Sequence, residues 1–386
     1  MRIQFGISRE AFASEYFEQN YLLLRGALRD AAFSLADVDH LLHVTEPGHP
    51  LLRLHNGGFV AEEAYIEHYN DLGTQRRRII RNNFYSLLKG GATLILNRVE
   101  QRQPLVRALC LEVAHFTSQH AIANGYLAFG HNASFGKHWD THDVFAVQLH
   151  GRKRWQLFKP TLELPLSGQT SKDVKGECPA DPVLDIILEA GDVLYIPRGW
   201  WHCATPIGEE TFHVAIGVHP AFITDYIAWL CSYKLPQYLS CRHSLSFVHD
   251  NQERVRAAAQ DVGAALASES NLQEYLSLIR NSDRVQSGFD LRTNVSGAMP
   301  VIEPGTVVRL NAIYPRDAHA QTPLVLNGRA IPLNELEQIV VAGLAQERMA
   351  TVAQLQERSG AAQDSIHATL RKLLAKDLVQ LMPAAG

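Results

Sequence analysis

The chain has 386 residues, 46% of them hydrophobic, and a formal net charge of −4. It is long enough for two or three globular domains. Its net charge is negative, so the chain lacks the overall positive potential that nonspecific binding to nucleic acid needs. No apolar run approaches the roughly 18 residues of a membrane span, and the five scattered cysteines, without a C-x-x-C pair, argue against disulfides and structural zinc. With no basic stretch followed by an apolar one at the start, we expect a cytoplasmic protein.

The first part of the chain shows a helical sequence pattern followed by a strand-like one. Residues 9–120 carry mostly helical patterns, with amphipathic stretches at 61–69 and 104–124. From 125 to 220 the pattern changes to short apolar or alternating runs that Gly, Pro and Asp separate. Many short strands without long helices between them predict an antiparallel sandwich or barrel, so we expect an α+β domain over residues 1–220.

The second part of the chain is predicted to hold two further domains. Helical periodicity returns from 222 to 282, within an expected helical domain at 221–300. The order of elements in the expected domain at 301–386 resembles a winged helix, with two strand-like pieces, three helices and a strand at residues 307–313, 323–326, 333–347, 352–359, 363–376 and 378–382. Because residues 334–386 hold five basic and six acidic side chains, we expect protein contact or structural support from this domain, without direct binding to nucleic acid.

A candidate metal site lies in the strand-rich region. His138 and Asp140 are two residues apart, so on a strand both side chains reach the same face. A third ligand, His202, ends the run 191–202 (GDVLYIPRGWWH), where the chain leaves an apolar strand. Two imidazoles and one carboxylate leave open positions on an ion, as non-haem Fe(II) oxygenases require. On a helix, His138 and His142 would instead sit one turn apart and bind zinc, but the residues from 143 to 150 read as a strand.

Several motifs in order give the chain a family resemblance. They are residues 91–98 (GATLILNR), the Asn124-x-Tyr126 pair, His138-x-Asp140 followed by 143–145 (DVF) and Gln148, residues 151–155 (GRKRW), and residues 191–202. Through them the chain resembles the JmjC-type oxygenases, specifically the cupin-like ribosomal oxygenases, strongly over residues 91–220 and in outline elsewhere. The resemblance implies a double-stranded β-helix (cupin/JmjC barrel) with flanking helices, as the catalytic domain at 1–220.

The resemblance also implies the site and its chemistry. His138, Asp140 and His202 would bind Fe(II), and the protein would use 2-oxoglutarate and O2 to hydroxylate a protein or peptide side chain, such as one of a ribosomal protein. No catalytic side chain is expected beyond these metal ligands.

The same resemblance assigns residues to the cosubstrate. Lys153 would bind the distal carboxylate of 2-oxoglutarate, which needs a buried cation, although a lysine at a hairpin tip can equally be solvated. Asn124 and Tyr126 would line the same pocket, against the alternative of a turn Asn and a core Tyr. His213 lies either near the cosubstrate or in the core, as a histidine whose ring nitrogens have hydrogen-bond partners.

Two departures from the family pattern leave the substrate open. Residues 128–136 (AFGHNASFG) replace a Pro-rich loop, and residues 20–26 (NYLLLRG) lack the usual preceding proline. An oxygenase of a modified peptide or small natural product is therefore an alternative, as is a catalytically silent cupin that acts as a binding module. The helices between 222 and 282 match the family's dimerisation segment in position, so their apolar faces are buried either in a homodimer or within the chain.

Overall fold

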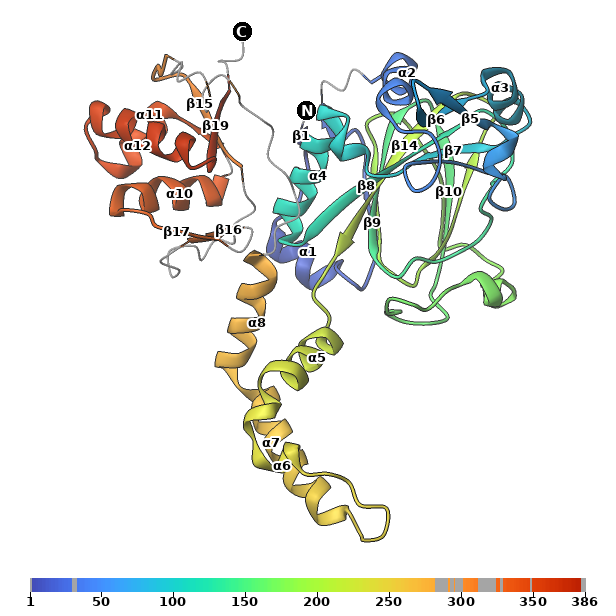
Figure 1. Cartoon of the computed structure of the whole chain (residues 1–386). Helices are drawn as coiled ribbons and strands as arrows, with labels where there is room; N and C mark the ends of the chain where they lie inside the picture. The colour runs from blue at the N-terminus through green and yellow to red at the C-terminus, as the bar shows by residue number, and fades with distance from the viewer. Residues whose placement is uncertain are drawn as a thin grey trace. The chain divides into compact units, whose positions relative to one another are not determined.

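The computed structural model describes residues 2–29, 33–281, 301–311, 324–326, 329–347 and 349–382, together with residues 291 and 295. The chain divides into two compact units, Met1–His219 and Pro220–Gly386 (Figure 1). The predicted boundary at residue 300 lies outside the described residues, as do 312–313 and 323 of the predicted strands. No helix in the described part of the chain has both the length and the apolarity that crossing a membrane requires.

Two antiparallel sheets form the body of the first unit (Figure 1). The larger has seven strands in the order β2 (Leu22–Leu24), β12 (Val193–Ile196), β9 (Asp143–His150), β14 (Thr211–His219), β8 (His120–Ala128), β7 (Thr93–Leu96) and β4 (Leu52–His55). The smaller has β11 (Leu184–Leu188), β10 (Lys153–Phe158) and β13 (Trp201–Pro206). From β9 to β14 the chain passes repeatedly between the two sheets, which is the winding of a double-stranded β-helix.

Central strands such as β9 are buried on both faces. On one face, the Phe145 ring packs against the rings of Phe5 and Phe12. On the other, Ala146 joins Trp155 of β10 and Leu194 of β12 in a core cluster between the sheets. Because successive side chains of a strand point to opposite faces, this near-continuous apolar run fills both layers and needs covering on both sides.

Helices cover the large sheet, as predicted. Helix α4 (Pro104–Thr117) contacts β8 and β14, and α1 (Arg9–Glu15) contacts α4. The predicted amphipathic stretch 104–124 is a helix only to Thr117, because Ser118 adopts a left-handed conformation (φ 55°) before β8 begins. Other elements of this unit are β1 (Arg2–Ile3), β3 (Leu28–Arg29), α2 (Leu35–Val44), α3 (Arg81–Lys89), and the 3-10 helices η2 (Val99–Gln101) and η3 (Lys172–Glu177).

The predicted helix at 61–69 is wrong. A short 3-10 helix, η1 (Glu62–Ala64), is followed by β5 (Ile66–Asp71), which pairs with β6 (Thr74–Ile79). The hairpin turns at Leu72 and Gly73, both with positive φ, and the Asn70 side chain accepts a hydrogen bond from the Gly73 amide at 2.8 Å. Cross-strand pairing outweighs the local helical period here.

The second unit begins with helices around an aromatic cluster. These are α5 (Ile223–Tyr233), η4 (Leu235–Gln237), α6 (Leu239–Arg242), α7 (Gln252–Ala267) and α8 (Glu269–Asn281). The rings of Tyr226 and Trp229 on α5 meet Tyr275 on α8, with centroids 5.3 and 5.6 Å away respectively. The helical prediction for this segment is therefore correct up to residue 281, except for the loop at residues 243–251 between α6 and α7.

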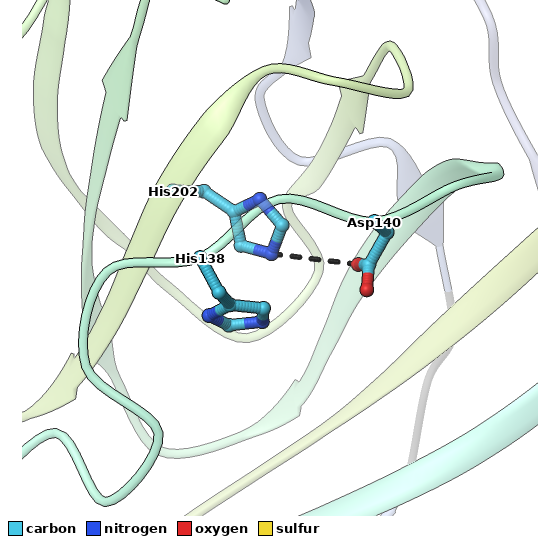
Figure 2. A group of neighbouring side chains, drawn as sticks. All are labelled: His138, Asp140 and His202. Atoms are coloured by element: carbon cyan, nitrogen blue, oxygen red, sulfur yellow. Dashed lines mark ion pairs between the residues drawn. The ribbon is translucent and has the colours of Figure 1, made fainter. Parts of the chain in front are cut away.

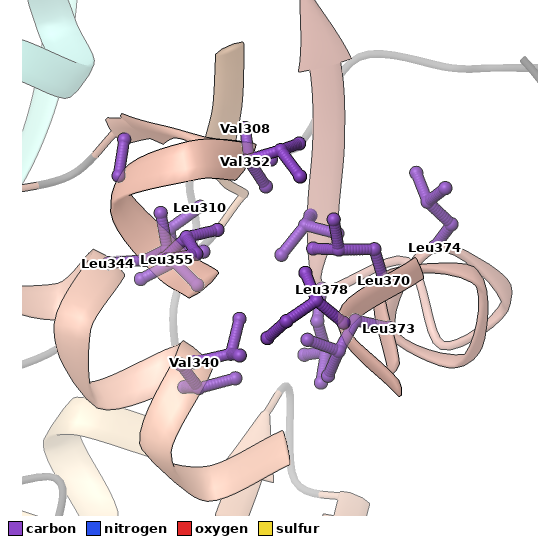
Figure 3. Close-up of a cluster of buried hydrophobic side chains, with 14 of the residues drawn as sticks. Val308, Leu310, Val340, Leu344, Val352, Leu355, Leu370, Leu373, Leu374 and Leu378 are labelled. Carbon is purple, nitrogen blue, oxygen red and sulfur yellow. The ribbon is translucent and has the colours of Figure 1, made fainter. Parts of the chain in front are cut away.

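The last part of the chain packs three helices against a three-stranded sheet. Strand β15 (Val307–Leu310) lies between β18 (Met349–Thr351) and β19 (Val379–Met382), and the pair β16 (Leu324–Leu326) and β17 (Arg329–Ile331) is separate. Helices α10 (Glu335–Glu347), α11 (Val352–Ser359) and α12 (Gln363–Ala375) contribute buried aliphatic side chains to one core (Figure 3). Helix α11 begins where the Thr351 hydroxyl accepts the Gln354 amide (3.2 Å) and ends at Gly360 with φ 62°.

Candidate metal centre

His138 and His202 are joined through their backbones. The His138 amide donates to the His202 carbonyl at 3.1 Å, and the His202 amide donates back at 2.8 Å. The strand predicted at 138–140 is reduced to this single bridge beside β13. The Asp140 side chain reaches the same place, so that one ligand atom from each of the three residues lies within 4.8 Å of the others (Figure 2). The structure thus brings together the three predicted metal ligands.

Backbone carbonyls orient both imidazoles. Nδ1 of His138 lies 3.0 Å from the Gly136 carbonyl, and Nδ1 of His202 lies 3.1 Å from the Trp200 carbonyl. Since a carbonyl only accepts, each Nδ1 carries the proton and each Nε2 keeps a lone pair for a metal. His202 Nε2 lies 3.5 Å from an Asp140 carboxylate oxygen, the contact drawn as a dashed line in Figure 2.

The electrostatics of the group fit a divalent cation. Burial, reinforced by the neighbouring His138, lowers the pKa of His202 to about 4, which keeps this imidazole neutral. Burial resists ionisation of Asp140, but His202 and His138 together hold the pKa of its carboxyl below the usual value. A neutral imidazole and an ionised carboxylate are the protonation states in which these side chains bind metals.

The residues between and beside the ligands anchor them from the opposite face. Trp139 and Trp201 are both buried and share a cluster with Phe158. Ser171 accepts a hydrogen bond from the Trp139 amide at 3.1 Å, and its hydroxyl donates to the Trp139 carbonyl at 3.2 Å. Because alternate residues of extended chain point to opposite sides, burying these tryptophans turns the ligands toward the interior.

A buried cation lies further along the interior. Lys153 on β10 is only 3% exposed, and its Nζ lies 3.5 Å from Nδ1 of His213 on β14. Burial lowers the pKa of Lys153 to about 7, and burial together with Lys153 lowers the pKa of His213 well below its usual value. No carboxylate of the described residues forms an ion pair with Lys153. A buried ammonium without an anionic partner favours binding of an anionic ligand beside it.

The other predicted cosubstrate residues come from the facing sheet. The Tyr126 ring stacks on His213 with centroids 5.0 Å apart and planes 12° apart. Two residues earlier on β8, the Asn124 side chain accepts a hydrogen bond from the Arg98 amide at 3.2 Å. Lys153, Tyr126 and His213 are therefore close together, and the Asn124 side chain contacts both Tyr126 and the Arg98 amide. Their roles toward a cosubstrate stay predictions.

Three further residues belong to this interior, although sequence analysis gave none of them a role. Gln148 lies opposite His213 in the sheet register and is fully buried, with its Oε1 unpartnered among the described residues. The ring centroids of Trp155 and His213 lie 5.2 Å apart. Trp155 is two residues after Lys153 on β10, so both side chains point to the same face. The ring centroids of Phe135 and His138 lie 5.9 Å apart, and no sequence motif indicates a place for Phe135 at the site.

The alternative pairing of His138 with His142 is wrong. The residues between them are not helical, and the His142 ring stacks on His219 at a centroid distance of 5.0 Å. His138 therefore belongs to the group with Asp140 and His202, and it does not form a zinc site with His142.

Comparisons with known proteins agree with this architecture. Residues 100–226 match the family model of the JmjC domain. The bifunctional lysine-specific demethylase and histidyl-hydroxylase NO66 of Drosophila persimilis is 37% identical over 117 residues, which are 30% of this chain and 16% of that protein. NO66 of Aedes aegypti is 27% identical over 158 residues, 40% of this chain and 25% of that protein. The match thus spans about a sixth to a quarter of these relatives.

Solved structures extend the likeness of fold to nearly the whole chain. The Escherichia coli ribosomal oxygenase YcfD has a TM-score of 0.60 at 16% identity and covers 99% of this chain and 100% of its own. YcfD in complex with cobalt and 2-oxoglutarate has a TM-score of 0.59 at 15% identity, covering 98% and 99%. Residues 100–226 thus match the JmjC domain, and the predicted JmjC/cupin fold and the predicted resemblance to JmjC-type oxygenases are confirmed.

Metal binding should depend on His202 and not on His142. We expect His202→Ala to weaken Co(II) binding by more than about 100-fold, since loss of a residue that merely supports a ligand already costs about 10–100-fold. His142→Ala, the matched control, should keep the affinity of the wild type. The measurement is titration of the visible Co(II) absorption, and loss of binding in His142→Ala with retention in His202→Ala would contradict the assignment.

Proposed function

We propose that this chain is an Fe(II)- and 2-oxoglutarate-dependent dioxygenase that hydroxylates a side chain of a protein or peptide. The observation that carries the proposal is the pairing of two features inside one JmjC fold. A His-Asp-His group can hold a metal, and on the same interior face lies a buried lysine that forms no ion pair with a carboxylate of the described residues. A dicarboxylate that chelates the metal at one end needs such a cation at its other end.

In this proposal each residue has one role. His138, Asp140 and His202 hold the iron and leave positions open for 2-oxoglutarate and O2. Lys153 binds the distal carboxylate as an ammonium. It lies four residues along β10 from Leu157, the strand partner of His202, which is about 13 Å along the strand. The lysine side chain and a five-carbon dicarboxylate together span that interval.

Asn124, Tyr126 and His213 line the cosubstrate end in this proposal. Tyr126 offers a hydroxyl, and burial keeps its pKa well above the usual value, so the group stays a hydrogen-bond donor. His213 remains neutral beside Lys153 and lends the ammonium a hydrogen-bond acceptor in the absence of a ligand. The Asn124 side chain lies next to Tyr126 along β8 and accepts a hydrogen bond from the Arg98 amide, which fixes its position.

Bound iron, with 2-oxoglutarate and O2, supplies the oxidising power of the reaction. The chain binds the ion, orients the cosubstrate and keeps the interior dry with residues such as Trp155 and Leu157. No side chain has to act as an acid or a base, so we assign no catalytic residue beyond the metal ligands.

For the substrate we propose a protein side chain, with ribosomal proteins as the first class to test. The name of YcfD describes a ribosomal oxygenase, and the name of NO66 describes a histidyl-hydroxylase. Residues 128–136 depart from the family loop, and Phe135 of this loop lies beside His138. That position near the ligand supports a modified peptide or small natural product as the second candidate substrate.

We further propose that residues 221–300 are a helical homodimerisation segment. Six of its large hydrophobic side chains, each more than 60% exposed, lie within 26 residues: Ile223, Tyr233, Leu239, Leu245, Phe247 and Val248. Such a density of exposed apolar residues is typical of a protein interface. We propose a winged-helix-like role in protein contact or support for residues 301–386, without direct nucleic-acid binding, in a cytoplasmic protein.

Turnover tests the proposed activity. Purified protein with Fe(II) and 2-oxoglutarate should form succinate and consume O2, slowly without substrate, and His138→Ala should reduce both to background. His243→Ala, an exposed histidine of the second unit, should match the wild type. Absence of turnover together with absence of iron binding would support the catalytically silent cupin instead.

The affinity for 2-oxoglutarate should fall as pH rises. Free Lys153 has its pKa lowered to about 7, and only the ammonium binds a carboxylate. The affinity for 2-oxoglutarate is therefore at its maximum below pH 7 and decreases about tenfold per pH unit above it. The decrease stops once the pH exceeds the pKa of Lys153 in the complex. We expect a loss of about tenfold or more between pH 6.5 and 8.5, measured by anaerobic calorimetry on Co(II)-loaded protein. In Lys153→Arg the guanidinium stays charged, so the slope should vanish; equal slopes in both proteins would refute the role of Lys153.

Sedimentation equilibrium tests the homodimer. Replacing Phe247 and Val248 by Asp should shift the dimer toward monomer by at least about tenfold in dissociation constant, because two charges would be buried without partners. Leu72→Asp, at the exposed hairpin tip of the first unit, is the matched control and should leave the equilibrium unchanged. A monomeric wild type would contradict the proposal directly.

A further inference from the structure

A fully buried carboxylate lies just beyond the metal ligands. Asp143, the first residue of β9, is 0% exposed and comes three residues after Asp140. Its Oδ1 accepts a hydrogen bond from the Tyr195 hydroxyl at 3.1 Å and another from the Arg198 amide at 3.0 Å. Its Oδ2 is buried without a hydrogen-bond partner among the described residues, and burial, opposed by the two donors to Oδ1, raises the pKa of Asp143 to about 6.

The two segments that carry the ligands meet at this carboxylate. The amide of Gly199, next to Arg198, donates to the Asp140 carbonyl at 3.0 Å. Successive amides of the connection between β12 and β13 therefore bond to the Asp143 side chain and to the Asp140 backbone. His202 follows three residues later and pairs with His138. The Asp143 contact thus closes a ring of hydrogen bonds that includes the backbones of all three ligands.

The Arg198 side chain is itself anchored. It is 6% exposed, and its guanidinium contacts Glu18 at 2.7 Å and the Pro165 carbonyl at 3.1 Å. The Glu18 amide in turn donates to the Tyr195 hydroxyl at 3.0 Å. The Arg198 side chain is therefore held by Glu18 and Pro165, whereas its amide is held by the Asp143 carboxylate, and this amide contact links the turn before His202 to a side chain of the segment that carries Asp140.

We propose that Asp143 is a positioning residue of the metal centre, whose carboxylate sets the separation of Asp140 and His202 by holding the Arg198 amide. The inference rests on the metal centre of the proposed function but not on the identity of the cosubstrate or substrate. Residues that support metal ligands in this way commonly change metal affinity by about 10–100-fold.

Co(II) affinity and the Co(II) absorption spectrum of the folded protein test this role. Asp143→Ala should weaken Co(II) binding by about 10–100-fold and change the spectrum, because the ligand separation is no longer fixed. Asp143→Asn keeps an oxygen acceptor for Arg198 and Tyr195, so it should restore affinity to within about threefold of the wild type. If Asp143→Ala does not fold, Asp143→Ser, too short to reach the Arg198 amide, takes its place with the same expectation.

A control separates positioning from general stability. Val214, fully buried on β14, makes none of these hydrogen bonds, so Val214→Ala should lower the Tm while leaving Co(II) affinity and spectrum unchanged. Wild-type affinity and spectrum in Asp143→Ala, with only a lower Tm, would overturn the positioning role and leave the proposed function intact. Failure of the wild type itself to bind Co(II) would overturn both.

Discussion

The reciprocal backbone hydrogen bonds between His138 and His202 are the constraint on which the site depends. They set two ligands opposite each other without relying on any flexible side chain, and the extended chain then delivers Asp140 to the same side. The alternation of strand residues turns Trp139 and Trp201 into the core on the opposite face. The pairing of His138 with His202 is therefore a property of the backbone beside the small sheet, and that sheet is stabilised by ordinary apolar burial.

A second constraint is electrostatic. The interior between the sheets is apolar near Ala146 and Leu194 but polar in the row of Lys153, His213 and Gln148. A buried ammonium is unfavourable without an anion, and a fold keeps one only where something compensates for it. A dicarboxylate bound between Lys153 and the metal would provide that compensation. The polar row and the ligand group are thus two ends of one proposed binding site.

Much of the fold and the ligand group could be predicted from the sequence, because strand periodicity and the His138-x-Asp140 spacing are local signals. The hairpin at β5 and β6 was not predicted, because residues 61–69 show a helical period by themselves and the strand that pairs with them, Thr74–Ile79, lies just outside that stretch. Phe135 also escaped prediction, because its place beside His138 follows from how an irregular loop folds back. Asp143 was visible as part of a motif, but its partner, the Arg198 amide, belongs to a separate segment.

The most direct test of the account is a crystal structure of the protein grown anaerobically with Mn(II), as a substitute for Fe(II), and 2-oxoglutarate. The account predicts one ion bound by His138, Asp140 and His202, chelated by the cosubstrate, with the distal carboxylate against the Lys153 ammonium. An ion bound elsewhere, such as at His142 and His219, or a cosubstrate carboxylate held by another cation, would contradict it.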